Sequence, residues 1–331
     1  MRWDKGFSAE YIAMKVNPKT WEDEGEILIT GGKIDRDIES ALLESANIET
    51  TEELGEMWIR LYLVAKQGES AERIPLFTGL TSCPTRNLNG YNPSFSVDCY
   101  SVLTPCADRM LPRGWFAPKD GSGAEIIADL LSIGGAEVKT IQGAGLLTGA
   151  IVAESGETYL SMAHKVANAI GWQIRIDGRG TIHVEPFPSE VAMRFDTDFD
   201  VIQPGIKDTR DWYSCPNVLR VTYESYAAIA RDDDPESPLS TVSRGREIWA
   251  EEAVQLSSSA PLATYAQQRL KELQNPAREI TYTRRFMPNL RPGDVVGISY
   301  PEARIDGAFR VKSQSITLGY GAETEETVYG N

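Results

Sequence analysis

Residues 156–188 constrain the fold more than any other stretch, because a helix pattern there leads directly into a hairpin pattern. The first half carries one apolar helix face at three-and-four spacing, made of Tyr159, Met162, Ala163, Val166, Ala167 and Ile170. Gly171 follows as a helix stop, since glycine tolerates the left-handed cap geometry. Residues 172–176 (WQIRI) then alternate like a strand, and Asp177-Gly178 is a hairpin turn signal. We therefore predict a compact α/β module near the middle of the chain.

Alternating patterns on both sides of this module predict β structure. Residues 57–65 (MWIRLYLVA) are the most strand-like run before it, and residues 218–224 (VLRVTYE) and 280–286 continue the pattern after it. Residues 33–38 (KIDRDI) alternate apolar with charged, which fits a half-buried strand, whereas residues 41–46 fit one helical turn or the next strand equally well. About six short strands in the first hundred residues predict a small barrel or a sandwich.

These patterns together predict an α+β, mainly β fold in three parts. Residues 1–105 form an N-terminal tube-like β domain, a barrel or a sandwich. Residues 106–190 hold the linker and the α/β insert, because a proline- and arginine-rich stretch begins there. Residues 191–331 form a C-terminal tube-like β domain with one helix, expected at residues 261–274 with proline at its first position.

The charge balance limits the partners that such a chain can bind. Its 331 residues carry 48 acidic and 33 basic side chains, a formal charge of −15. Non-specific affinity for nucleic acid comes from Lys and Arg neutralising phosphates, so a large phosphate-gripping surface is not expected. A surface past which nucleic acid slides without sticking remains compatible with this charge. No run of eighteen apolar residues and no signal-peptide core occurs, so neither a membrane span nor a secretory signal is expected.

The cysteines and histidines offer no catalytic or zinc pattern. The four cysteines (Cys83, Cys99, Cys106 and Cys215) show no CxxC spacing, and we expect free thiols in a reducing cytoplasm. The only histidines, His164 and His183, would need a nucleophile and an acid across the fold, and no GxSxG sequence occurs. The glycine-rich residues 141–150 lack the lysine of a phosphate-binding loop. We therefore predict no catalytic residue and no cofactor.

Two acidic clusters have to be weighed as cation sites. Asp196, Asp198 and Asp200 are spaced like ligands, but the glycine and distal glutamate of a calcium loop are missing and apolar residues interleave. A strand with a solvated acidic face explains this cluster better. Residues 232–234 (DDD) are most simply a solvated charge run before a proline. Weak metal binding is the alternative at both places, and we assign no metal ligand.

Several segments in a consistent order resemble the baseplate hub proteins of tailed phages and phage-like particles, the late-control or tail-hub family. The resembling segments are residues 15–18 with Trp21, 29–34, 76–80, 97–103 with 111–115, 156–172, 237–246 and 292–296. They spread over nearly the whole length. Each segment alone is unspecific, so their order carries the resemblance.

The resemblance implies a structural, non-enzymatic protein of the virion tail baseplate, made in the host cytoplasm. Such hubs are homotrimeric rings in which each subunit supplies two tube-like domains, so that three subunits match the sixfold tail tube and carry the threefold tip or spike. The implied partners are the tail tube or distal tail protein, the central spike or tip protein and the tape measure protein. DNA would only pass through the lumen.

Two other classes of function have to be kept beside the hub. One is a tail-tip adaptor or carbohydrate-binding module for host attachment, with Trp58, Trp115, Trp172 and Trp249 as sugar platforms. Aromatic side chains more often anchor cores and interfaces, which favours the hub. The other is a cell-wall hydrolase, which would need paired carboxylates in a cleft.

Overall fold

The computed structural model describes residues 1–82, 84–89, 92–196, 205–223, 225–254, 262–274 and 278–330. The chain divides into two compact units. The main unit contains residues 1–206 and 281–328, and the second unit contains residues 207–280 and 329–331. Strands make up 47% of the structure and helices 16%, which confirms the α+β, mainly β fold class.

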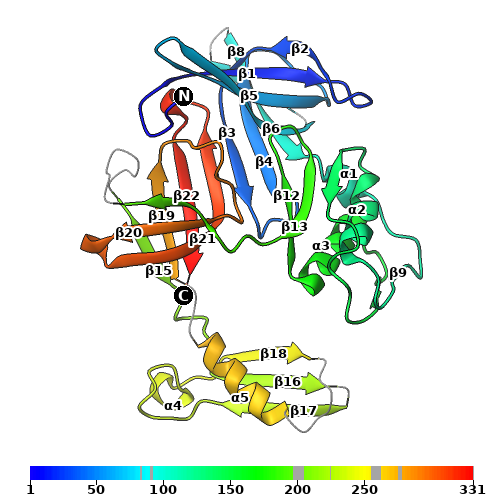
Figure 1. Ribbon diagram of the computed structural model, residues 1–331, viewed down its shortest axis with the longest axis vertical. Coiled ribbons are helices and arrows are strands. Elements are labelled where there is room, and N and C mark those ends of the chain that lie inside the picture. Colours follow the sequence, from blue (N-terminus) through cyan, green and yellow to red (C-terminus); the bar gives the residue numbers. More distant parts are fainter. Residues whose placement is uncertain are drawn as a thin grey trace. The chain divides into compact units, whose positions relative to one another are not determined.

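The first hundred residues form one antiparallel arrangement of strands (Figure 1). The strands are β1 (Ser8–Val16), β2 (Asp23–Ile27), β3 (Ile29–Asp37), β4 (Glu44–Thr50), β5 (Trp58–Gln67), β6 (Ser70–Thr81), β7 (Thr85–Asn89) and β8 (Asn92–Ser101). Residues 41–46, for which the sequence left two alternatives, divide into a turn at 41–43 and the first residues of strand β4 at 44–46. A β-bulge in the β5–β6 pair lies at Leu76, next to Pro75, because the register passes from Leu61 opposite Phe77 to Tyr62 opposite Pro75.

The C-terminal strands of the main unit continue this same sheet. They are β14 (Val191–Phe195), β19 (Arg278–Arg284), β20 (Val295–Tyr300), β21 (Ile305–Thr317) and β22 (Thr324–Gly330), with 3-10 turns at Pro301–Ala303 and Tyr320–Ala322. Residues 313–317 of β21 pair antiparallel with residues 33–37 of β3. Within the main unit the strands follow the path β19-β22-β21-β3-β4-β8-β6-β5-β1-β2, and off this path β20 pairs with β21 and with β14. The sheets of the described residues stay open, so the closed-barrel alternative is not realised.

The central α/β module forms much as the sequence predicts. It contains α1 (Thr104–Asp108), β9 (Phe116–Ala117), α2 (Gly123–Ser132), β10 (Val138–Thr140), β11 (Ile151–Val152), α3 (Tyr159–Ile170), β12 (Trp172–Ile176) and β13 (Ile182–Pro186). Thr158 and Ser161 form a reciprocal capping box at the start of α3. Gly171 ends the helix in the left-handed region with φ of 68°. The hairpin of β12 and β13 then pairs in register, with Ile174 opposite Val184.

The second unit has its own small core. It contains β15 (Lys207–Arg210), β16 (Val218–Tyr223), β17 (Tyr226–Arg231), α4 (Thr241–Arg244), β18 (Trp249–Ala253) and α5 (Leu262–Leu273). The sheet order is β17-β16-β18. Leu219 and Val221 of the central strand pack with Leu262, Ala266 and Leu270 of α5. Apolar burial against one helix therefore stabilises this unit.

Two of the hydrophobic clusters among the described residues of the main unit bear on the site. One lies among the strands and includes Ile34, Ile48, Leu63 and Phe77 together with Ile316 from the C-terminal region. The other fills the α/β module, where α2 and α3 pack against the hairpin. No helix within the described ranges is long and apolar enough to cross a membrane.

Candidate functional site

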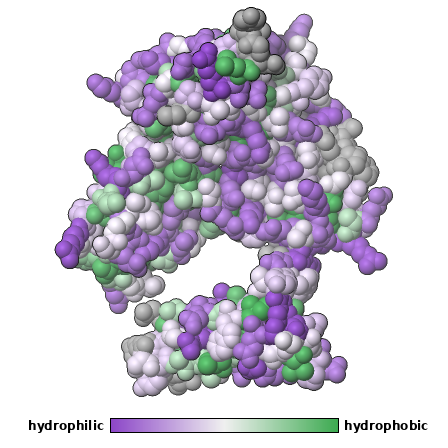
Figure 2. Space-filling model, turned by 180° about the vertical axis from the view of Figure 1, so that it is seen from behind, coloured by the Kyte–Doolittle hydropathy of each residue, from purple (hydrophilic) through white to green (hydrophobic). Residues whose placement is uncertain are grey.

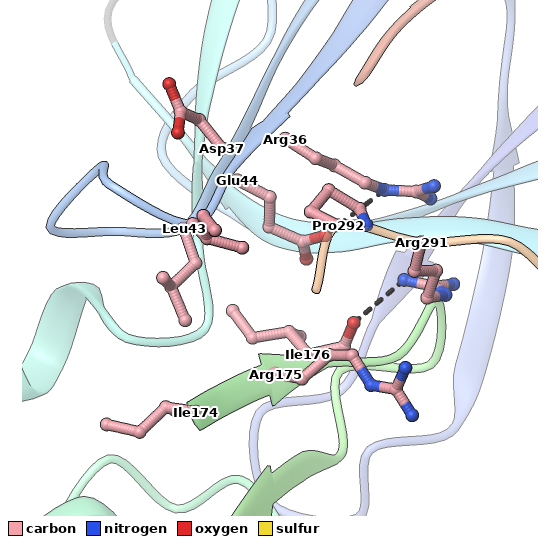
Figure 3. Close-up of a pocket in the computed structure, with 10 residues that line it drawn as sticks. Arg36, Asp37, Leu43, Glu44, Ile174, Arg175, Ile176, Arg291 and Pro292 are labelled. Atoms are coloured by element: carbon pink, nitrogen blue, oxygen red, sulfur yellow. Dashed lines mark hydrogen bonds and ion pairs between the residues drawn. The ribbon is translucent and has the colours of Figure 1, made fainter. Parts of the chain in front are cut away.

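A pocket in the main unit forms where three distant segments meet. It is lined by the end of β3 and the start of β4, by β12, and by the turn before β20. Figure 3 shows Arg36 and Glu44 side by side, with Arg291 reaching toward β12. The N-terminal strands, the α/β module and the C-terminal strands each supply charged side chains here. We call this pocket the ionic junction.

The α/β module is tied to the C-terminal segment by charge-assisted hydrogen bonds. Arg175 of β12 bonds Asp294 at 2.9 Å and Glu185 at 2.9 Å. Arg291 donates its Nη1 to the Ile176 carbonyl at 2.8 Å, and its backbone N–H donates to Asp294 at 2.8 Å. The turn at residues 292–294 (the P-G-D turn) therefore fixes the position of the hairpin as well as changing the chain direction.

The same hairpin also contacts the N-terminal strands. Thr78 of β6 donates its hydroxyl to the Gly178 carbonyl at 2.9 Å, and Arg60 of β5 donates to the Arg179 carbonyl at 3.2 Å. A Cβ atom on Gly178 would stand 1.9 Å from the Pro75 carbonyl oxygen. The residue that the sequence marks as a hairpin turn must therefore be glycine because another strand approaches its backbone.

A second buried network extends from the ionic junction into the C-terminal strands. Arg36 donates to Gln314 at 3.4 Å, and Gln314 donates to Glu326 at 2.7 Å. Arg284 bonds Glu326 through Nη2 at 2.5 Å and through Nε at 3.1 Å, and Tyr282 donates to the same carboxylate at 2.5 Å. Arg284 and Glu326 are 1% and 0% exposed, so bulk solvent does not reach this pair. Such networks contribute most when every member is bonded.

Burial dominates the electrostatics of these carboxylates and cations. Burial raises the pKa of Glu44, although the positive charges of Arg36 and Arg291 oppose this shift. Burial likewise lowers the pKa of Arg36 and raises that of Asp294. Burial, with the negative charge of Glu326 beside it, raises the pKa of the Tyr282 hydroxyl. The junction therefore holds charges whose desolvation is only partly offset by their partners.

The residues weighed as catalytic from the sequence do not gather in one place. The His164 ring nitrogen Nε2 lies 2.9 Å from the Ala41 carbonyl, and His183 Nε2 lies 3.2 Å from the carboxylate of Asp177. Cys99 and Cys106 are buried and free, and burial raises the pKa of their thiols to about 12 and about 11. Protonated thiols of this kind are poor nucleophiles.

The other two cysteines differ in what the structure describes. Cys215 is buried and free in the second unit, whereas Cys83 lies outside the described residues. Burial raises the pKa of the Cys215 thiol as well. The thiols that the structure describes therefore have the character of core side chains.

The acidic clusters do not form a described cation site. Asp196 is exposed, and Asp198 and Asp200 lie outside the described residues. Asp232 accepts hydrogen bonds from Ser237 and Gln274, and Asp233 is bonded by Arg231 and Thr241. Within the described ranges, no group of three or more His, Cys, Asp and Glu side chains is placed to hold a metal ion. These carboxylates organise their own loop.

Three of the four tryptophans weighed as sugar platforms pack against a hydrophobic core. Trp58, Trp115 and Trp172 are half-buried and pack against the core of the α/β module. Trp249 in the second unit is 48% exposed. One exposed ring of the four therefore remains available to stack on a ligand.

The surface offers one more candidate, on the α/β module. Phe116 and Val152 stand opposite each other in the β9–β11 pair and are 58% and 64% exposed, and Met110 nearby in the chain is 68% exposed. Residues 109–119 carry three basic side chains and no acidic one, in a chain of charge −15. Figure 2 shows apolar side chains in scattered groups on an otherwise hydrophilic surface. We call Met110, Phe116 and Val152 the apolar rim.

Comparison with known proteins gives no match by sequence and clear matches by structure. No protein-family model matches the chain, and no curated protein matches its sequence. The tail protein from Neisseria meningitidis MC58 aligns with a TM-score of 0.68 at 15% identity, covering 99% of this chain and 97% of that one. The prophage MuSo2 43 kDa tail protein from Shewanella oneidensis aligns with a TM-score of 0.65 at 12% identity, covering 96% and 98%. The chain has the fold of phage tail proteins.

A third match links this fold to a larger assembly. A chain in the half-lidded structure of the Francisella PdpA–VgrG complex aligns with a TM-score of 0.60 at 8% identity. The alignment covers 98% of this chain and 58% of that one. The resemblance to baseplate hub proteins that the sequence suggested is consistent with these neighbours.

Proposed function

We propose that this chain is a structural subunit of the baseplate hub in a phage or phage-like tail. Three copies form a ring that joins the sixfold tail tube to the threefold tip or spike. The observation that carries the proposal is the alignment with two phage tail proteins over nearly the full length of all three chains.

The architecture supports a load-bearing role. Strands from both ends of the chain share one sheet through the β3–β21 pair, and the ionic junction holds the α/β module against them. A ring subunit has to keep its shape when its neighbours pull on it. In this proposal the two tube-like β domains correspond to residues 1–105 and 191–331, with the linker and α/β insert at 106–190 between them.

Ring closure would also protect exposed parts of the sheet. Strand β2 stands at the end of the strand order, where unpaired backbone groups invite pairing with other chains. The apolar rim and the basic residues 109–119 offer a second contact, which suits the acidic surface of a neighbouring copy. We propose that neighbouring subunits cover one or both of these places.

The proposal assigns partners and a place in the particle. The tail tube or distal tail protein meets one face of the ring, and the central spike or tip protein and the tape measure protein meet the other face and the lumen. DNA passes through the lumen without being held. The protein is made in the host cytoplasm, becomes part of the virion tail and has no enzymatic activity.

The first experiment measures the mass of the purified protein by light scattering, followed by negative-stain imaging. The expected result is a particle of three chain masses with a central hole. A monomer that stays monomeric when the spike protein of the same tail is added would refute the hub proposal. A zymogram on purified cell wall should be run in parallel, and lysis would refute the non-enzymatic assignment.

A matched pair of variants tests the role of the apolar rim in assembly. Phe116→Glu places a negative charge on the rim and should reduce the trimer fraction at least tenfold at equal concentration. Ser70→Glu adds the same charge at an exposed polar position of the same unit and should leave the trimer fraction unchanged. If the two variants assemble equally well, the rim is not a subunit contact.

The second candidate function is a tail-tip adaptor or carbohydrate-binding module. The observation that favours it is the exposed ring of Trp249. Saturable binding of purified host glycans that Trp249→Ala abolishes, in a protein that remains monomeric, would replace the hub proposal by this one.

A further inference from the structure

Two polar atoms in the ionic junction are buried without a partner. Within the described part of the chain, neither Arg36 Nε nor Glu44 Oε1 has a hydrogen-bond partner. Arg36 and Glu44 are 5% and 4% exposed. Their nearest approach, between Arg36 Nε and Glu44 Oε2, is 3.7 Å, which is an ion pair but too long for a hydrogen bond. One donor and one acceptor therefore face the same pocket unsatisfied.

Other buried arginines in the main unit do not share this feature. Arg284 Nε donates to Glu326 at 3.1 Å, and Arg60 Nε donates to Thr78 at 3.0 Å. More than nine in ten buried polar groups in proteins are hydrogen-bonded, because an unpaired one costs about 1–3 kcal/mol. The Arg36–Glu44 pair is thus an exception, and a bound ligand would satisfy its two unpaired atoms.

The pocket has the size and lining that a single small ligand requires. It offers about 30 Å³ to the centre of a water-sized molecule, beside the apolar side chains of Leu43, Ile174 and Ile176. A buried water needs roughly 10–15 Å³ of such space and two to four polar partners. We propose that the ionic junction binds an internal water molecule that accepts from Arg36 Nε and donates to Glu44 Oε1.

A small anion fits the same pocket less well. Arg36, Arg175 and Arg291 bring positive charge to the lining, which would attract an anion, and Asp37 and Glu44 bring negative charge. An anion accepts hydrogen bonds only, so beside an ionised Glu44 it would satisfy Arg36 Nε and leave Glu44 Oε1 unpaired. Water both donates and accepts hydrogen bonds, so one water molecule satisfies Arg36 Nε and Glu44 Oε1 together. This site is independent of the protein's place in a tail.

Magnetisation transfer from water to arginine side chains tests the proposal in the intact protein. In a sample labelled with nitrogen-15, the Arg36 Nε–H proton should show cross-peaks to water of opposite sign in the laboratory-frame and rotating-frame experiments, which is the signature of a long-lived bound molecule. Arg36→Lys removes the resonance and so assigns it. The Arg284 Nε–H proton, buried against a carboxylate, is the matched control and should show no such cross-peak.

Each outcome bears on the proposal. A water cross-peak at Arg36 that is missing at Arg284 and unchanged by sodium bromide supports the bound water. An Arg36 proton without a water cross-peak overturns it. A saturable shift of the Arg36 resonance with bromide, accompanied by loss of the cross-peak, also overturns it and assigns the pocket to an anion.

Discussion

The pair formed by Arg284 and Glu326 makes the sharpest test of how the C-terminal strands are held. Glu326 accepts four hydrogen bonds, two from Arg284 and one each from Tyr282 and Gln314. Arg284→Met removes the only cation among these donors and leaves a buried carboxylate with two neutral partners. Breaking a buried pair in this way costs about 3–5 kcal/mol of the free energy of unfolding.

The matched control is an exposed ion pair in the same unit. Lys66 and Glu10 lie 2.7 Å apart with side chains 46% and 61% exposed. Lys66→Met should therefore cost less than about 1 kcal/mol, because water already solvates both charges. The charged atoms are similarly close in the Arg284–Glu326 and Lys66–Glu10 pairs, so the difference in the free energy of unfolding between the two variants reports the effect of burial.

Amide hydrogen exchange is the assay, because it reports the opening free energy of individual strands in a chain with two units. Protection in β21 and β22 should fall in Arg284→Met and stay unchanged in Lys66→Met. In a double-mutant cycle, Glu326→Leu should cost about 2 kcal/mol less when Arg284 is already Met. If Arg284→Met costs no more than the control, or if the cycle is additive, the buried pair does not stabilise these strands.

Three further changes test the ionic junction and the α/β module. Burial raises the pKa of Glu44 from 4.5 to about 7, so the stability linked to its proton is complete below pH 4.5 and is lost as the pH rises through 7. Relative to Glu44→Gln, the free energy of unfolding of the wild type in urea should therefore fall by on the order of 3 kcal/mol between pH 5 and pH 8. A relative gain over this range would show that the Arg36 charge outweighs burial. Gly178→Ala drives a methyl group into the Pro75 carbonyl and should cost about 1–3 kcal/mol, whereas Gly149→Ala, with open space around it, should be close to neutral, and equal effects would contradict the close approach. Thr158→Ala removes the N-cap of α3 and should cost about 1 kcal/mol, with faster amide exchange confined to the first turn; unchanged exchange there would refute the cap.

Local patterns predicted the elements of the α/β module well. The helix at α3, its glycine stop and the following hairpin depend on neighbours within a few residues, and each lies within a residue or two of its predicted position. The helix expected at residues 261–274 also forms, as α5 (Leu262–Leu273). The strands at β5 and β16 agree with the runs that predicted them.

The ionic junction was harder to predict, although a signal was present. Arg36 lies between Ile34 and Ile38 at the two-residue spacing of one strand face, and Arg284 follows Tyr282 at the same spacing. A charged residue in an apolar register is a candidate for burial, but its partner cannot be named from the sequence. Glu44 and Glu326 come from other strands, and only pairing brings them within reach.

The sequence by itself determined the mainly β class, the central helix and hairpin, and the excess of negative charge. These depend on side-chain period, turn residues and composition, all of which are local or additive. The tertiary structure decided that residues 33–37 pair with 313–317, that residues 207–280 form a unit of their own, and that the P-G-D turn holds the hairpin. Any alternating strand offers the same backbone hydrogen bonds, so hydrogen bonding alone does not select which distant strands pair. The pairing depends instead on how the whole faces of the strands fit together and are buried.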